Sequence, residues 1–323
     1  MTKTANPTPT LQSTLKKLLR QRWKELAQQI KQLSADDNAE AIHELRINTR
    51  RLQELVPLAA DVVKSPAAAN TVKALRQARK VCSEVRDADV LMSMIEPRKS
   101  RAERDGRMWD AMTTHLRRRR VKSHSGAKRS LDRLDLATLS TKWIAALEKW
   151  PKADAKIEKR LRRDLVKHLS RRLKQFQRAH EAATKPEAMT EDVHNLRLAG
   201  KRLRFALEVT RDLTDGQAKS ALGQLRTFQT ALGEWSDLEL LCELIIDRCS
   251  RRKFLREKTD IAQGLLQTLG KLRGTTRTKL RRSMSLADDL GHVNTVLEEF
   301  ANGHGGNGHK PKAEAKGKAK AKT

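Results

Sequence analysis

The chain has 323 residues, and its 68 lysines and arginines outnumber 39 aspartates and glutamates, giving a formal net charge of +29 at pH 7. A surplus of this size creates a long-range field that attracts polyanions. No stretch approaches the ~18 apolar residues of a membrane span, and the N-terminus has no apolar leader, so we expect a cytoplasmic protein without membrane contact.

Helical periodicity runs through most of the chain. From Leu11 to about Ser283, apolar residues recur every three or four positions, and Gly and Pro are few. This pattern predicts an all-α protein. Residues 1–10 and the tail 301–323, which is rich in Gly and then in Lys and Ala, offer little to bury, so we expect both to be disordered.

An internal repeat organises the helical stretch. Residues 42–52, Ile-His-Glu-Leu-Arg-Ile-Asn-Thr-Arg-Arg-Leu, align with residues 193–203, Val-His-Asn-Leu-Arg-Leu-Ala-Gly-Lys-Arg-Leu. A second block follows in the same order, in which Arg76, Glu84 and Asp87 match Arg226, Glu234 and Asp237. Two blocks in one order indicate duplication of a whole helical unit.

Each repeat is expected to contain a long leading helix, a His-bearing helix, a third helix, and a fourth helix capped by Asp87 or Asp237. The expected boundaries are about 11–125 for the first repeat, 126–152 for a linker, 153–285 for the second repeat and 286–300 for a short C-terminal segment. Two pseudo-symmetric four-helix bundle units forming one domain are therefore the predicted architecture.

Each His-bearing helix carries a basic face beside an apolar one. At about 100° per residue, His43, Arg46 and Arg50 share one side of the first such helix, and Leu45 and Leu52 lie on another. The second copy repeats the basic face with His194, Arg197, Lys201 and Arg204. A single stripe of this kind is usually a solvated surface, but its presence in both copies favours a binding role.

Further cations extend these faces on the third helices and on the leading helix of the second repeat. They include Lys73, Arg76, Lys80, Lys219 and Arg226, and a ridge that contains Arg163, Lys167 and Arg171. Like charges at this spacing weaken a helix by ~0.2–0.5 kcal/mol per pair, so either a bound polyanion or a need for solubility accounts for the ridge. The planar fork of Arg, the point charge of Lys and the imidazole of His all suit phosphate.

Catalytic and metal motifs are missing from this pattern. His43-Glu44 resembles the start of a zinc-protease helix, but Ile47 stands where the second ligand is required. No glycine-rich phosphate loop and no nucleophile with an evident base occur, and Asp87 is interpreted as a helix cap. We therefore expect a protein that is not an enzyme and that holds no metal or cofactor.

The doubled motif Val/Ile-His-x-Leu-Arg-x-x-x-Lys/Arg-Arg-Leu resembles the CHAD family, the conserved histidine α-helical domain, over about residues 11–285. The resemblance implies two four-helix bundles around a basic cavity that binds inorganic polyphosphate, often at polyphosphate granules. The lining that it implies is His43, Arg46, Arg50, Lys73, Arg76, Lys80, His194, Arg197, Lys201, Arg204, Lys219 and Arg226. Arg51, Arg163, Lys167, Arg171 and Arg202 complete our set of candidate polyphosphate-binding residues.

The two repeats are not equally basic. Thr230 aligns with Lys80, and Ser236 aligns with Arg86, so we expect the third helix of the second repeat to contribute less to binding.

The rival interpretation is a nucleic-acid-binding or nucleoid-associated protein, which the net charge and the Lys/Ala-rich tail favour. An aromatic content of 3%, with no Tyr, argues against single-strand binding. The sequence indicates no oligomeric state.

Overall fold

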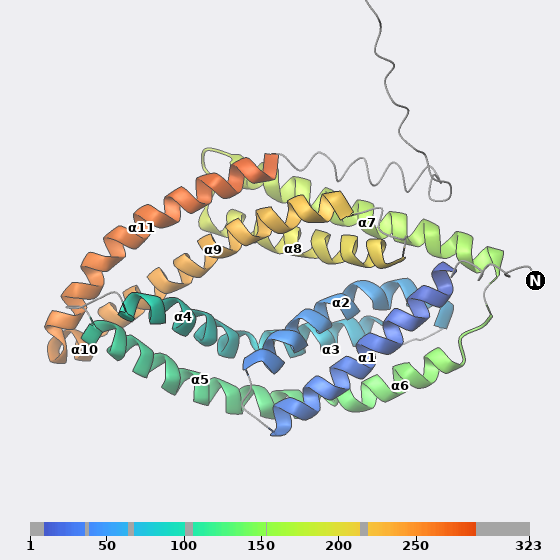
Figure 1. Cartoon of the computed structure of the whole chain (residues 1–323), viewed down its shortest axis with the longest axis horizontal. Coiled ribbons are helices and arrows are strands. Elements are labelled where there is room, and N and C mark those ends of the chain that lie inside the picture. Colours follow the sequence, from blue (N-terminus) through green and yellow to red (C-terminus); the bar gives the residue numbers. More distant parts are fainter. Residues whose placement is uncertain are drawn as a thin grey trace, which may run out of the picture.

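The computed structural model describes residues 10–35, 39–63, 68–100, 106–152, 154–213 and 219–288, and over these ranges the chain forms eleven helices and no strand (Figure 1). The helices are α1 (Leu11–Ala35), α2 (Ala39–Val63), α3 (Ala68–Val81), α4 (Ser83–Ser100), α5 (Gly106–Leu134), α6 (Leu136–Glu148), α7 (Ala155–Thr184), α8 (Thr190–Leu213), α9 (Lys219–Ser250), α10 (Arg252–Glu257) and α11 (Thr259–Asp288). The all-α prediction is confirmed. Residues 1–9 and 289–323, which hold both segments predicted to be disordered, lie outside the described residues.

The duplication is visible in the order and packing of the helices. In the first repeat α1 packs on α2, α2 on α3, and α4 on α5, and in the second α7 packs on α8, α8 on α9, and α9 on α11. The pair α3–α4, interrupted by a turn at Cys82, therefore corresponds to the single helix α9. The two copies contact each other most where α2 meets α8, and also where α1 meets α7, α4 meets α9 and α5 meets α11.

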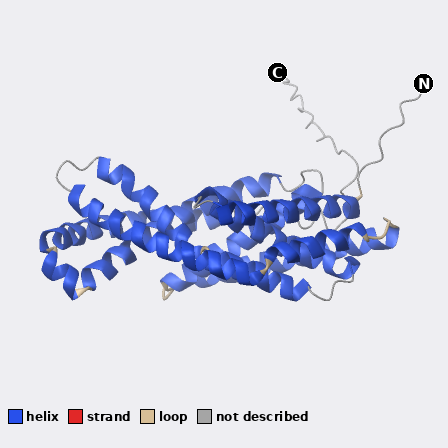
Figure 2. Ribbon diagram, turned by 90° about the horizontal axis from the view of Figure 1, so that it is seen from below, coloured by secondary structure: helices blue, strands red, loops and turns tan. Residues whose placement is uncertain are grey.

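Three hydrophobic cores hold this arrangement together. The first joins α1, α2, α3, α6 and the first half of α7, and contains Trp23, whose ring stacks on Trp143 at 5.8 Å between centroids. The second joins α8 to the second half of α7 and the first half of α9. The third is shared between the repeats, because α4 and α5 bury residues against α9, α10 and α11. The result is an elongated, flattened helical body (Figures 1 and 2).

The segment 126–152, expected as a linker, is instead mostly helical. α5 continues to Leu134, and α6 begins one residue later, after Asp135, whose side chain accepts a hydrogen bond from the Thr138 amide at 3.3 Å. Leu131, Trp143 and Leu147 from this segment are buried in the first core. Its apolar positions thus serve the first repeat, which is why the segment does not behave as a connection between repeats.

The capping role assigned to two aspartates is also wrong. α4 begins at Ser83, so Asp87 lies in its second turn, and Asp237 lies in the middle of the uninterrupted α9. Neither carboxylate can serve the free amides of a helix start, and both line the pocket described next.

Candidate functional site

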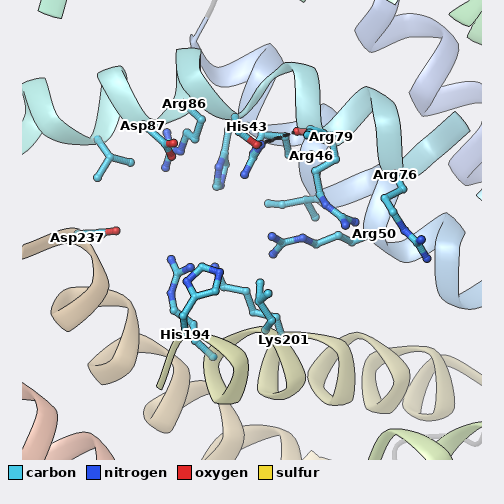
Figure 3. Close-up of a pocket in the computed structure, with 16 residues that line it drawn as sticks. His43, Arg46, Arg50, Arg76, Arg79, Arg86, Asp87, His194, Lys201 and Asp237 are labelled. Atoms are coloured by element: carbon cyan, nitrogen blue, oxygen red, sulfur yellow. Dashed lines mark hydrogen bonds between the residues drawn. The ribbon is translucent and has the colours of Figure 1, made fainter. Parts of the chain in front are cut away.

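A pocket of about 540 Å³ lies between the two repeats, and α2 and α8 form facing walls (Figure 3). His43, Arg46 and Arg50 enter it from α2, and their spacing of three and four residues puts them on one side of the helix. Leu45 and Leu52, on the other side, are fully buried and fix the rotation of α2. α8 contributes His194, Arg197 and Lys201, which have the same spacing of three and four residues. The structure thus brings together the basic faces of both repeats.

α3 and α4 add a third wall that only the first repeat supplies. Arg76, Arg79 and Lys80 come from α3 and Arg86 from α4. In all, eight Lys or Arg side chains and two histidines line the pocket, against the carboxylates of Asp87 and Asp237. Such an excess of one charge in a small, partly dehydrated space favours an anionic ligand.

Hydrogen bonds orient one of the central guanidinium groups. Nη1 of Arg46 donates to the backbone oxygen of Arg79 at 2.7 Å and to Oγ of Ser83 at 2.8 Å. The equivalent Arg197 is held less tightly, since its buried Nε has no hydrogen-bond partner among the described residues. A buried donor without a partner is costly, and an anion oxygen would satisfy it.

Burial and mutual repulsion lower the pKa values of the basic side chains. Burial, and then the charges of Arg79 and Arg46, lower the pKa of Arg50 to about 9, and similar causes lower that of Arg79 to about 10. Both groups stay charged at neutral pH. The pKa of Lys201 falls well below 10.5, first through burial and then through the nearby Arg197. An incoming anion would relieve this repulsion.

Burial shifts the histidine and the carboxylates toward their neutral forms. The pKa of His43 is lowered from 6.5 by burial and then by the charge of Arg86, so its imidazole is neutral at pH 7. Burial raises the pKa values of Asp87 and Asp237 above 3.8, although Arg46 acts against this shift at Asp87 and Arg197 at both. The two carboxylates lie at one end of the pocket (Figure 3).

A second pocket of about 410 Å³ continues the first, because Arg50, Arg76, Arg79, Leu198 and Lys201 line both. It brings in the predicted Arg202 and also Arg172, which the sequence did not single out.

Arg172 belongs to a buried network between α2 and α7. Its Nε and Nη2 each donate to Glu54 at 3.0 Å, and Nε2 of His168 lies 2.5 Å from Glu54 Oε2. Burial alone would raise the pKa of Glu54, but the hydrogen bond from His168 and the charge of Arg172 outweigh it and lower the pKa.

Three predicted residues are bound to a buried carboxylate instead of facing the pocket. Arg51, Arg204 and Arg226 converge on Glu208, with nitrogen-to-oxygen distances of 3.6, 3.5 and 3.8 Å. The Arg204 guanidinium also lies 4.6 Å from the centre of the Phe205 ring. These arginines connect α2, α8 and α9, so their position indicates a structural role.

The remaining predicted residues lie apart from both pockets. Lys73, Arg163, Lys167 and Lys219 are exposed, and Nη2 of the exposed Arg171 lies 3.1 Å from Nδ1 of His168. The ridge on α7 therefore does not share a site with the stripes on α2 and α8.

Sequence reasoning missed Arg79 and Arg86 as lining residues. Both occur only in the first repeat. Their counterparts in the second repeat are Gln229 and Ser236, so a search for basic positions shared by the two copies passes over them. The signal that was present is their spacing, because Arg79 follows Arg76 by three residues and Arg86 follows Arg79 by seven.

Neither metal-binding clusters nor membrane spans were found over the described ranges. No three His, Cys, Asp or Glu side chains gather there in a way that could hold a metal ion. None of the described helices combines the length and apolar character needed to cross a bilayer.

Comparison with known proteins identifies the family. The model of the CHAD domain matches residues 6–245, which is most of the chain. The protein belongs to the CHAD family. A crystal structure of the CHAD domain from the plant Ricinus communis matches with a TM-score of 0.57 at 18% identity, covering 92% of this chain and 95% of that one. No curated protein matches.

The CHAD motif residues can now be placed in the fold. The histidines that follow Ile42 and Val193, and the arginines three residues later, all face the pocket between the repeats. The doubled motif of this CHAD protein thus marks the two facing walls of a single cavity.

Proposed function

We propose that this CHAD protein binds inorganic polyphosphate in the pocket between its repeats. The observation that carries the proposal is the lining itself, in which eight Lys or Arg side chains face one cavity with only two carboxylates. The CHAD resemblance of the motif points to the same ligand. Affinity is expected to come largely from release of counterions and so to fall with salt.

The shape of the site favours a linear phosphate chain over an isolated phosphate. The two pockets share five lining residues and form one continuous basic space between α2, α3 and α8. Each phosphate of a polyphosphate chain carries charge, so a chain can use cations along the whole length.

Nucleic acid suits this lining less well. Apart from the two histidines, the aromatic side chain among the described residues that line the two pockets is Phe205, in the second pocket. Guanidinium groups cover its ring, with Arg50 and Arg204 at 5.8 and 4.6 Å from the ring centre. It offers no free face for stacking a base.

A binding role without catalysis, in the cytoplasm and at polyphosphate granules, is part of the proposal. A nucleic-acid interaction through the Lys/Ala-rich tail is the rival, and it predicts binding that is independent of the pocket.

The test compares the double variant R46Q/R197Q with the matched surface variant K271Q/R277Q in the full chain. Gln removes the charge but keeps an amide that can donate to the Arg79 carbonyl, and Lys271 and Arg277 are exposed on α11 and line neither pocket. We expect R46Q/R197Q to lower affinity for long-chain polyphosphate at least about tenfold and to reduce the salt slope by about 1 to 2. The control should change affinity less than about twofold.

Titrations at two salt concentrations, with circular dichroism to confirm folding, give the measurement. Equal losses in both variants would show that the pocket is not the site. Tighter binding of RNA or duplex DNA than of polyphosphate at the higher salt would favour the rival.

A further inference from the structure

A basic groove lies on the outer side of the first repeat, where α5 packs against the junction of α3 and α4. Its volume is about 500 Å³, and α5 lines it with Arg119, Lys122, Ser123, Arg129 and Ser130. Val81 and Glu84 form the opposite wall. We call this space the α5 groove.

The cations of the α5 groove are not neutralised within the protein. Over the ranges that the structure describes, no carboxylate lies within ion-pair distance of Arg119, Lys122 or Arg129, and all three side chains are exposed. The one acid in the lining, Glu84, accepts a hydrogen bond from Ser123 Oγ at 2.8 Å. The groove therefore carries a surplus of positive charge that is open to a ligand.

The α5 groove borders the central pocket across a single helical junction. Along α3 and α4, Lys80, Ser83 and Asp87 line the pocket, whereas Val81 and Glu84 line the groove. The two sets are neighbouring faces of the same helices. The charge of Arg119 also acts on Asp87, so the two sites share an electrostatic field.

The second repeat lacks the cations of the α5 groove at the matching positions. α5 aligns with α11 when Ser123, which donates to Glu84, is matched to Lys279, which pairs with Glu234. This register also matches the buried Leu116 and Leu131 to the buried Leu272 and Ala287. The residues that replace Arg119, Lys122 and Arg129 are then Thr275, Thr278 and Ser285.

Glu234, the counterpart of Glu84 in the second repeat, forms an ion pair with Lys279 at 2.5 Å. Thr230 and Ser236 stand where the first repeat has Lys80 and Arg86, so the pocket lining loses cations on the same side. The cations that line the pocket and the α5 groove on the side of α3, α4 and α5 therefore have few basic counterparts in the second repeat.

We infer that the α5 groove is a second phosphate-binding site, which takes the segment of a polyphosphate chain that leaves the central pocket over the first repeat. This inference rests on the proposed function. It gives the bound chain a direction, because the three cations of the α5 groove have no basic counterparts at the matching positions of α11. It also makes affinity depend on chain length, since a short chain fills the pocket without reaching the groove.

The experiment compares R119Q/K122Q/R129Q with K271Q/R277Q/R281Q, which removes the same charge from exposed positions on α11. Tripolyphosphate and long-chain polyphosphate are titrated against each full-length variant and against the unsubstituted protein. For long chains, the groove variant should lose about tenfold or more in affinity, and its salt slope should fall by about 2. Its affinity for tripolyphosphate should stay within about twofold, and the α11 control should match the unsubstituted protein for both ligands.

Equal affinity of the groove and α11 variants for long chains would overturn the inference, even with polyphosphate binding intact. Loss of duplex DNA binding with unchanged polyphosphate binding would also overturn it and would make the groove a nucleic-acid surface. Failure of the proposed function has a separate signature, because R46Q/R197Q would then bind tripolyphosphate and long chains as the unsubstituted protein does.

Discussion

Asp87 and Asp237 occupy equivalent positions in the two repeats and are the carboxylates among the residues that line the pocket. The charge of Asp237 raises the pKa of Asp87, and each carboxylate is close enough to Arg197 for that charge to act on it. They offset part of the repulsion among the arginines of the empty pocket, and they repel the anion that the pocket would bind. Because burial raises their pKa values above 3.8, falling pH neutralises them earlier than exposed aspartates and makes the pocket more positive.

The double variant D87N/D237N should therefore bind polyphosphate more tightly at neutral pH. A charge pair near 4 Å in water-like surroundings is worth about 1 kcal/mol, so removing two repulsive carboxylates is expected to raise affinity by up to about thirtyfold. The affinity of the unsubstituted protein should rise as pH falls from 7 to 5, and that of the variant should rise less, because its pocket no longer holds the two aspartates that protonation neutralises. Titration across this range measures both effects.

The variant D87N/D237N is also expected to change the stability of the folded protein. A folded-state pKa above 3.8 means that ionisation of these aspartates costs stability at neutral pH, so D87N/D237N should be the more stable protein there. The exposed pair E187Q/D260N is the control for net charge. Weaker binding by D87N/D237N than by this control would indicate that the carboxylates position Arg46 and Arg197 instead of competing with the ligand.

Helical spacing in the sequence indicates which candidate residues of one helix share a face. His43, Arg46 and Arg50 face the pocket because the apolar residues between them must be buried, and duplication marks the same face on α8. The sequence did not predict that Glu208 forms ion pairs with three arginines. The pairing of acids with bases between helices depends on how α2 packs against α8 and α9. Tertiary contacts of this kind leave no periodic trace in a sequence.

At the scale of elements, α6 is the part that the repeat does not explain. It lies between the copies in sequence, yet it packs on α1. Trp143 donates from Nε1 to Thr71 Oγ1 at 3.0 Å, and Ser140 Oγ donates to the backbone oxygen of Trp23 at 2.8 Å. Residues typical of turns and caps between Ser123 and Pro151, such as Gly126 and Asp135, made 126–152 look like a linker. The burial of Trp143 shows that the segment completes the first core.

Truncation of the Trp143 side chain tests whether α6 supports the first repeat. We expect W143A to lower the free energy of unfolding by about 3 to 5 kcal/mol, through loss of the ring and the cavity that it leaves. W143F should lose less, because it keeps a ring against Trp23 and gives up one hydrogen bond worth about 1 kcal/mol. Urea unfolding followed by circular dichroism measures both. A loss below about 1 kcal/mol for W143A would mean that α6 is dispensable to the core.

At the scale of the whole molecule, contacts between the two repeats hold the walls of the pocket together. α4 and α5 of the first repeat reach α9, α10 and α11 of the second through the third core, and α2 meets α8 at the other end. The repeats thus surround a cluster of like charges that would otherwise push them apart. A ligand that neutralises the cluster contacts both repeats at once, so binding and folding should be thermodynamically coupled.

Polyphosphate should therefore raise the stability of the folded protein as a whole. At a free concentration 100-fold above the dissociation constant, a ligand that binds only the folded state adds about 2.7 kcal/mol to the free energy of unfolding. The unfolded chain has the same +29 charge and also attracts a polyanion. Polyphosphate therefore stabilises the fold only if its affinity for the folded protein, in which the cations are gathered in one pocket, exceeds its affinity for the unfolded chain. Unfolding in urea with and without long-chain polyphosphate measures the difference, and R46Q/R197Q serves as the comparison. A gain that vanishes in this variant would locate the coupling in the pocket, whereas a loss of stability would mean that polyphosphate prefers the unfolded chain and that no preformed site exists.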